Sequence, residues 1–355
     1  MHFWIIGAVI LGCLLLAWGG AARFFPRTEL PSRSSRSMGG LATFTVGAGY
    51  SGRIDSLAAQ VQDIFTRLEQ ELSTYRSDSA TSLLAERAGV DSVALSEDAW
   101  RVLNLALRFD ELSDGASDVT VAPLVKLWGF GSAPGSASLP SEETIREQLK
   151  FVDYRRVILK DRTAFLPVKG MAVDLGGIAK GYAVDRAFDF CRSVGVGNFL
   201  IDLSGNIRVS GRPHWGKKWQ IGVRNPFDRS SMVGKIALRS GLALATSGNY
   251  ERFVEFMGQR YSHIINPSTG LPVTGTAGVT VLCEDATTAD GLSTSLFVLG
   301  LKGCGKLLQK APPAEVLIVP DRYPVEIWLT RGFAEVFVPI PELSNAVRIL
   351  TPTSL

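Results

Sequence analysis

The segment Val173–Arg186 (VDLGGIAKGYAVDR) is the feature that most constrains how this chain can fold. Its first residues are typical of the end of a β-strand, and two glycines separate them from a helix that we expect to begin near Ile178. Small and apolar residues recur on that helix at helical spacing: Ala183, Ala187, Phe190, Cys191 and Val194. They predict a buried stripe, so the helix should pack against a core directly after a glycine turn.

The glycine turn could also hold an anion. Backbone N–H groups at a helix N-terminus approach phosphate closely, and the helix dipole favours negative charge there. Lys180 adds a positive charge in the first turn, and Asp174 places a hydrogen-bond acceptor just before the glycines. The GGxxxG spacing differs from the GxGxxG dinucleotide fingerprint, however, and such glycine pairs are often plain turns. On its own, the segment leaves both interpretations open.

Composition narrows the class of protein. At 355 residues the chain can form one large or two medium domains. The net charge of +3 is spread along the chain without a dense Lys/Arg face, which argues against a nucleic-acid partner. The four cysteines have no metal-ligand spacing and are interpreted as small buried hydrophobes: Cys13, Cys191, Cys283 and Cys304.

Residues 3–22 form an uninterrupted apolar segment that is long enough to cross a bilayer. Arg23 and Arg27 follow it, and a Ser/Arg/Pro-rich linker occupies residues 23–37. We favour a membrane anchor at residues 1–22, because the apolar run has full length. A cleaved signal peptide ending near residues 19–22 and a lipoprotein signal acylated at Cys13 are the alternatives. Export of the rest of the chain is expected.

Residues 38–340 predict one α+β catalytic unit. Apolar residues at spacings of three and four indicate a helix from Ile54 to Leu72, and Ser96 and Ser141 are suited to cap two further helices. After the central segment, short strand-like runs bounded by turn residues dominate. One helix over residues 288–300 interrupts them, and residues 341–355 are interpreted as a C-terminal tail.

Three polar, glycine-rich segments stand out in the β-rich half, namely Asp202–Ile207, Ala245–Arg252 and His263–Pro272. Each alone is typical of a turn. His263 in the third segment is either a structural histidine at a strand end or a general base, for which an imidazole that titrates near neutrality is suited.

The late helix carries a candidate metal site. Asp290 and Thr294 are four residues apart, so both side chains project from one face of the helix. They could form a plain surface pair. A carboxylate and a hydroxyl are also oxygen ligands that suit Mg²⁺, with a backbone carbonyl, phosphate oxygens and water in the remaining positions.

The order and the amino-acid sequences of these segments resemble those of the FAD:protein FMN transferase family, also called the ApbE-type flavin transferases. The resemblance covers residues 38–340. The segments that carry it are, in order, Met38–Gly40, Leu72–Tyr75, Gly115–Thr120, Trp128–Gly131, Val173–Arg186, Asp202–Ile207, Thr246–Arg252, His263–Pro272 and Ala289–Thr294.

The resemblance implies a fold and an activity. The fold would be a T-fold-like α+β domain with mixed and antiparallel sheets and flanking helices, attached to the membrane on the periplasmic side of the bacterial inner membrane. The enzyme would bind FAD and Mg²⁺ and transfer FMN onto a threonine hydroxyl of a target protein, releasing AMP. Targets in the family are typically subunits of membrane redox complexes.

The resemblance also implies site residues. Contacts to FAD would come from Met38, Tyr75, Ala116, Ser117, Asp118, Asp174, Lys180 and Ile264. The carbonyl of Gly177 would bind Mg²⁺ together with Asp290 and Thr294, and His263 matches the candidate base.

The chain departs from the family pattern at four positions, namely Ser117, Ser204, Asn266 and Ser268. The loss of an aromatic, an acid and an arginine could loosen ring contact or slow transfer. Two alternatives therefore accompany the transferase hypothesis. One is a Mg²⁺-dependent FAD pyrophosphatase that yields FMN and AMP, and the other is a non-catalytic, membrane-attached flavin-binding protein.

Overall fold

The computed structural model describes residues 30–47, 49–130, 139–214, 216–250, 253–256 and 259–351. The predicted membrane anchor or signal at residues 1–22 lies outside this part of the chain. None of the helices within the described ranges combines the length and the hydropathy that a membrane crossing needs.

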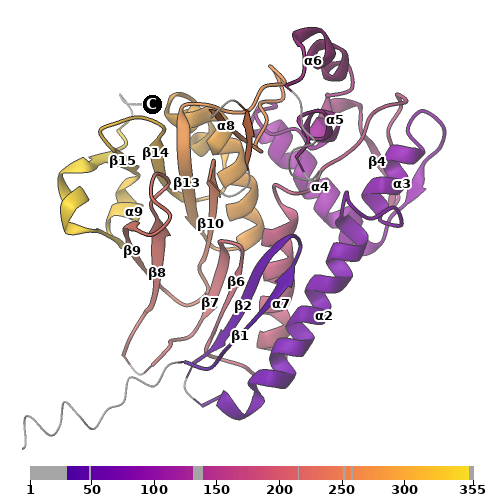
Figure 1. The fold of residues 1–355 in the computed structure, drawn as a ribbon. Coiled ribbons are helices and arrows are strands. Elements are labelled where there is room, and N and C mark those ends of the chain that lie inside the picture. The colour runs from indigo at the N-terminus through magenta and orange to yellow at the C-terminus, as the bar shows by residue number, and fades with distance from the viewer. Residues whose placement is uncertain are drawn as a thin grey trace, which may run out of the picture.

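A nine-stranded sheet forms the centre of the molecule (Figure 1). Its strands pair antiparallel to their neighbours, except for the last two, which are parallel. In spatial order they are β1 (Ser32–Ser37), β2 (Gly40–Val46), β6 (Phe199–Leu203), β7 (Asn206–Ser210), β10 (Ala243–Gly248), β13 (Thr276–Cys283), β14 (Glu315–Pro320), β15 (Ile327–Leu329) and β17 (Val347–Ile349).

Three helices cover one face of this sheet, namely α2 (Ile54–Leu72), α7 (Ala179–Ser193) and α8 (Ala286–Lys310). A fourth helix, α4 (Glu97–Leu112), packs against α2 and α8, and the four helices enclose the larger core. In Figure 1, α7 and α8 run behind the sheet, and α2 lies along its β1 edge. Each helix presents an apolar stripe inward, as its sequence period requires.

A second core fills the opposite face, where a three-stranded sheet and a short helix pack. These elements are β8 (Trp219–Arg224), β9 (Met232–Leu238), β16 (Phe337–Pro339) and α9 (Arg331–Ala334). Every residue of β13 is buried, because both faces of this strand are covered. The two layers therefore make the middle of the large sheet the most enclosed part of the fold.

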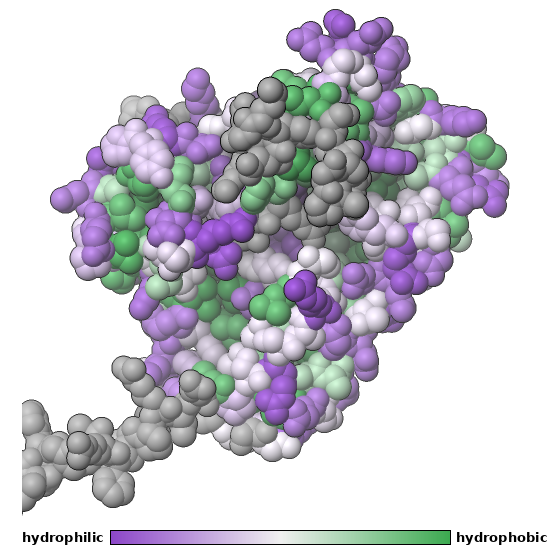
Figure 2. Space-filling view, in the orientation of Figure 1, coloured by the Kyte–Doolittle hydropathy of each residue, from purple (hydrophilic) through white to green (hydrophobic). Residues whose placement is uncertain are grey.

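The remaining elements lie beside the helical layer. Helices α5 (Ala122–Leu127) and α6 (Glu142–Leu149) form a small core with Trp128 and Ile265. Figure 2 shows hydrophilic residues over the projecting α6 and hydrophobic residues in a hollow near the middle of the same face. The other short elements are α3 (Ala80–Glu86), β3 (Val93–Ala94), β4 (Ile158–Lys160), β5 (Thr163–Phe165), β11 (Phe253–Phe256) and β12 (Gln259–Ser262).

Several elements match their sequence-based predictions. The helix predicted from Ile54 to Leu72 is confirmed, and the Ser96 and Ser141 side chains cap α4 and α6 by accepting from Ala99 N and Thr144 N. The late helix is longer than predicted and bends at Gly300, whose φ is +60°.

The predicted linker over residues 23–37 is wrong for its last six residues, which form β1. Their hydroxyl groups pair across the strands: Ser32 Oγ lies 3.1 Å from Thr45 Oγ1, and Ser34 Oγ lies 3.0 Å from Thr43 Oγ1. The tight turn to β2 is made at Met38 and Gly39, which both have positive φ. A segment whose composition is typical of a linker thus forms an edge strand here, because the threonines of β2 pair with its serines.

The predicted C-terminal tail over residues 341–355 contains regular structure within its described residues. Residues 347–349 form β17, which adds to the sheet in parallel beside β15. These three residues offered too short an apolar run to be recognised as a strand from sequence.

The three described cysteines are all buried, as predicted. Burial raises the pKa of the Cys191 and Cys304 thiols to about 12. Burial is also the main cause that raises the pKa of Cys283 to about 12. All three side chains therefore act as small core residues.

Helices α7 and α8 approach each other so closely that only glycine fits at position 181. A Cβ atom there would lie 2.2 Å from the main-chain oxygen of Ala286. Two carboxylates hold the contact. Asp185 on α7 accepts from Ala286 N at 2.9 Å and Thr287 N at 2.8 Å, and Asp290 on α8 accepts from Gly181 N at 2.9 Å.

We therefore predict that Gly181→Ala destabilises the protein by about 3 kcal/mol, because the added methyl group must push a backbone carbonyl away. Urea unfolding followed by circular dichroism measures the loss. Gly52→Ala is the matched control, since a Cβ at Gly52 meets nothing within 4 Å. Equal stability of Gly181→Ala and wild type would contradict the close contact.

Candidate active site

One cavity of about 1910 Å³ lies where the helical layer meets the large sheet. All twelve residues that the sequence predicted for the site line it, although they come from six separate stretches of the chain. They are Met38, Tyr75, Ala116, Ser117, Asp118, Asp174, Gly177, Lys180, His263, Ile264, Asp290 and Thr294. The structure thus brings the predicted residues together, and their individual roles stay predictions.

The turn before α7 forms a compact polar wall of the cavity. The Asp174 carboxylate accepts a hydrogen bond from Gly176 N at 2.7 Å, and Lys180 Nζ donates to the carbonyl of Gly176 at 2.8 Å. A Cβ atom at Gly176 would lie 2.9 Å from Asp174 Oδ1, so glycine permits this arrangement. The lysine is therefore folded back over the N-terminus of α7, where an anion would also be favoured.

Three oxygen donors meet beside this turn. Thr294 Oγ1 on α8 lies 3.4 Å from the carbonyl oxygen of Gly177. The Asp290 side chain is one helical turn away on the same face, and its residue is only 4% exposed. Burial raises the pKa of the Asp290 carboxyl, while the charge of Lys180 and the Gly181 N–H lower it. A carboxylate kept in such a place is expected to need a cation.

The donor set fits Mg²⁺. A carboxylate, a hydroxyl and a carbonyl are all hard oxygen ligands, and the 3.4 Å between the last two approaches the about 3 Å between adjacent ligands of an octahedral Mg²⁺. Asp290 Oδ2 accepts from Gly181 N, which leaves Oδ1 for a metal. The described ranges contain no cluster of three or more His, Cys, Asp or Glu side chains, so any metal here would depend on the neutral donors.

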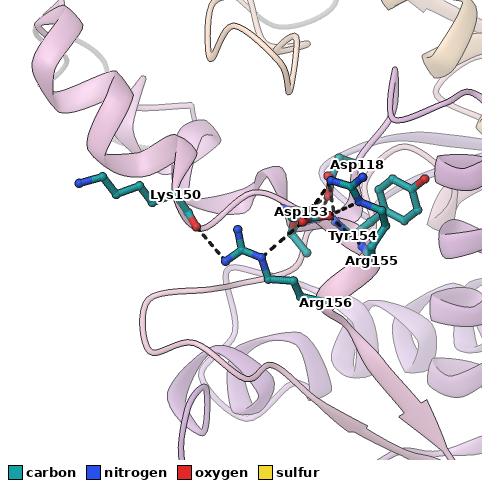
Figure 3. A network of polar contacts seen from close by, with 7 residues as sticks. Asp118, Lys150, Asp153, Tyr154, Arg155 and Arg156 are labelled. Carbon is teal, nitrogen blue, oxygen red and sulfur yellow. Dashed lines mark hydrogen bonds and ion pairs between the residues drawn. The ribbon is translucent and has the colours of Figure 1, made fainter.

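The loop Ser113–Asp118 follows α4 and forms another wall. Its Asp118 side chain is already engaged: Oδ1 accepts from Thr120 N at 2.8 Å, and Oδ2 accepts from Tyr154 N at 3.0 Å. Burial raises the pKa of Asp118, and the hydrogen bonds from Thr120 lower it in part. Figure 3 shows Asp118 joined in this way to the segment around Tyr154. Contact between Asp118 and a ligand would therefore use its main chain.

Met38 and Tyr75 lie at the helical side of the cavity. Met38 occupies the β1–β2 turn with φ +49°, and its N–H donates to Glu69 Oε2 on α2 at 2.9 Å. Tyr75 follows the end of α2 and is 63% exposed. An exposed ring at a cavity rim suits stacking on a flat ligand.

His263 and Ile264 directly follow β12 on another side of the cavity. The His263 and Phe130 rings are packed in a T-shaped arrangement, with their centroids 6.5 Å apart. The next turn, which begins at Asn266, is closed by the Asn266 side chain, which accepts from Ser268 N at 3.0 Å. Asparagine thus supplies the turn acceptor that the family's aspartate would supply.

Ser204 also fits its turn in spite of its departure from the family pattern. It adopts φ +54° between β6 and β7, and its N–H donates to the carbonyl of Leu41 at 2.9 Å. Its hydroxyl occupies the space beside Gly40, where a Cβ would lie 1.7 Å from Ser204 Oγ.

The cavity also has polar lining that sequence reasoning missed, from Asp110, Arg224 and Arg229. Strict alternation along β8 buries Trp219, Ile221 and Val223 and leaves Arg224 on the other face. The alternation of apolar and polar residues can be recognised in the sequence. It does not show that the exposed face of β8 borders the cavity.

Comparison with known proteins identifies the family to which the chain belongs. Residues 38–318 match the family model described as "ApbE family". A FAD:protein FMN transferase of Vibrio cholerae is 35% identical over 246 residues, which cover 69% of this chain and 74% of that protein. A protein of the same name from Treponema pallidum is 32% identical over 342 residues, covering 90% of this chain and 92% of its own length.

Solved structures support the same family assignment. The ApbE protein from Thermotoga maritima superimposes with a TM-score of 0.79 at 34% identity, covering 87% of this chain and 99% of that one. The flavin transferase ApbE from Vibrio cholerae gives 0.76 at 29% identity with the same coverage. The family match, the relatives and the shared mixed α+β fold lead to one conclusion: the chain belongs to the ApbE family and is a transferase enzyme.

Proposed function

We propose that this enzyme transfers FMN from FAD to a threonine hydroxyl of a target protein, with Mg²⁺ in the site and AMP as the leaving group. One observation carries the proposal: a single cavity gathers three oxygen donors, a lysine and a histidine. The name FAD:protein FMN transferase, which several relatives share, supports FAD as donor and a protein as acceptor. A subunit of a membrane redox complex is the target that the family resemblance suggests.

The size of the cavity supports two substrates. Typical small-molecule sites measure roughly 300–1,000 Å³. The cavity here, at about 1910 Å³, leaves room for an acceptor segment beside a bound dinucleotide.

In the proposed reaction, the threonine oxygen attacks the phosphorus of the FMN half of FAD. A new P–O bond forms while the pyrophosphate P–O bond breaks, and AMP leaves with the bridging oxygen. His263 takes the threonine proton, which makes the oxygen a better nucleophile. Lys180 and the N–H groups at the start of α7 bind the phosphates, and Asp174 orients the nucleotide.

Asp290, Thr294 and the Gly177 carbonyl would hold Mg²⁺, which would neutralise charge on the pyrophosphate. The Thr294 hydroxyl donates to the Gly177 carbonyl at 3.4 Å, so the chain's own contacts hold these two donors together. Asp290 is held separately, by the hydrogen bond from Gly181 N.

We predict that Asp290→Asn lowers Mg²⁺-dependent transfer at least about 100-fold, because the only carboxylate of the proposed ligand set becomes neutral. Stability should not fall, since a buried charge is removed while the amide oxygen can still accept from Gly181 N. In-gel flavin fluorescence of a denatured threonine-bearing acceptor measures transfer. Asp189→Asn, on an exposed position of α7, is the control. Full activity of Asp290→Asn would refute the metal assignment.

We predict that His263→Ala lowers transfer by about 10²–10⁴-fold while FAD affinity stays within about threefold, because a base acts on the acceptor and not on FAD. His214→Ala is the matched control, as His214 does not line the cavity. Full transfer activity of His263→Ala would refute the base assignment.

The products of the wild-type enzyme, analysed with and without acceptor, separate the alternative functions. Release of FMN and AMP by the wild type with a non-fluorescent acceptor would favour the pyrophosphatase. FAD that stays intact with the wild type would favour a flavin-binding protein.

We also propose that residues 1–22 anchor the enzyme in the bacterial inner membrane, with the catalytic domain on the periplasmic side. The uninterrupted apolar run supports this. The full chain is expected in the membrane fraction and open to protease added to spheroplasts, and deletion of residues 3–22 should release it from the membrane. A soluble product that lacks its N-terminus would instead establish a cleaved signal.

A further inference from the structure

A buried carboxylate that the proposed reaction does not use lies at the base of the loop Ser113–Asp118. Asp110, near the end of α4, borders the cavity although only 3% of its surface is exposed. Its Oδ2 accepts from Val119 N at 2.8 Å. Its main-chain oxygen accepts from Gly115 N at 2.8 Å and from the Ser113 hydroxyl at 3.2 Å. One residue thus fixes the loop at both of its ends.

The same hydrogen bonds continue into the wall around the α7 turn. The carbonyl of Val119, whose N–H is held by Asp110, accepts from Asp174 N at 2.8 Å. Asp110 is therefore only one residue removed from a predicted nucleotide contact. The far side of the loop is fastened separately, by Asp118 to the segment around Tyr154 (Figure 3).

The middle of the loop is tied to α8 through hydroxyl groups. Ser117 Oγ lies 3.2 Å from Ser113 Oγ and 3.0 Å from Ser295 Oγ. The Ser295 hydroxyl also lies 2.9 Å from the carbonyl of Gly291, and Ser295 directly follows the proposed metal ligand Thr294. The Ser117 side chain interacts with Asp110 as well and lowers its pKa. The loop, Asp110 and the face of α8 that carries Gly291 and Ser295 thus form one continuous polar cluster, next to the proposed metal ligands.

Stability alone does not account for a carboxylate here. Burial, followed by the nearby charge of Asp118, raises the pKa of Asp110 to about 7, against the lowering effect of Val119 N and Ser117. A buried carboxylate without a cationic partner costs stability relative to an apolar residue. No cation contact of Asp110 is found among the described residues. A carboxylate at this place is best explained by the loop that its hydrogen bonds position.

We propose that Asp110 is a positioning residue for FAD, which holds the loop Ser113–Asp118 against α7 and α8 so that Ala116, Ser117 and the main chain of Asp118 face the ligand. The inference rests on the proposed function, because it takes FAD as the ligand of this loop. It adds a residue that touches neither FAD nor the acceptor.

The test measures FAD affinity directly, by titration calorimetry with the full chain and without acceptor. We expect Asp110→Ala to weaken FAD binding at least about tenfold, with the maximal transfer rate at saturating FAD within about twofold of wild type. Asp110→Asn should restore affinity to within about threefold, since its amide can accept from Val119 N and keeps the same shape. Glu111→Gln, an exposed neighbour of Asp110 on α4 that does not line the cavity, should bind FAD as wild type does.

Thermal unfolding without FAD separates positioning from folding. Asp110→Asn should be at least as stable as wild type at pH 8, because the carboxylate is charged there and its burial is unfavourable. If Asp110→Ala fails to fold, Ser295→Ala replaces it. This change removes the hydrogen bond between Ser295 and Ser117 and leaves the apolar core intact. The dissociation constant of FAD should then rise about threefold.

Unchanged FAD affinity in a folded Asp110→Ala, or in Ser295→Ala where it stands in, would overturn the inference. Equal losses in Asp110→Asn and Asp110→Ala would also overturn it, because the charge and not the hydrogen bonds would then matter. A wild-type protein that binds no FAD would overturn the proposed function as well, so the two failures can be told apart.

Discussion

The close contact between α7 and α8 at Gly181 is the constraint on which the candidate active site depends. Every proposed metal donor and the lysine beside them belong to these two helices or to the turn that precedes α7. With no side chain at position 181, the backbone N–H of α7 can reach the Asp290 carboxylate, and Asp185 can hold the first turn of α8. Asp290 therefore has two roles: its carboxylate joins the two helices, and it supplies the only charged oxygen of the proposed metal site.

Carboxylates hold the walls of the cavity in place. Asp118, Asp174 and Asp110 each accept main-chain N–H groups of loops that border the cavity. Loops carry their own unpaired backbone donors, and a side chain that accepts them replaces the regular pairing of a strand or helix. The irregular segments of the site thereby keep a defined shape although neither sheet nor helix hydrogen bonds run through them. The large sheet contributes mainly the floor, on which β10 joins α8 through Ser247 and Ser293, whose hydroxyl oxygens are 2.8 Å apart.

Local sequence patterns predicted the α+β class and part of the candidate site, and the family resemblance supplied most of the FAD contacts. The apolar period of residues 54–72 and the spacing of Asp290 and Thr294 are local signals, and both were readable directly. Residues 32–37 were not, because serine and arginine favour linkers by composition. This strand is recognisable only by its pairing with the next strand of the hairpin, where Thr43 and Thr45 face its serines. Asp110 was missed for a similar reason. An aspartate beside Glu111 on an amphipathic helix is normally expected to face water, and only the packing of the following loop encloses it.

The buried cysteines bear on where such an enzyme can work. A thiol reacts with oxidants mainly as the thiolate, and a pKa of about 12 leaves almost none of that form near neutral pH. The described fold also contains no disulfide that would have to form for it to be stable. The three thiols of the described fold should therefore react little with oxidants, since both burial and protonation protect them. These cysteines are compatible with an oxidising compartment as well as with a reducing one.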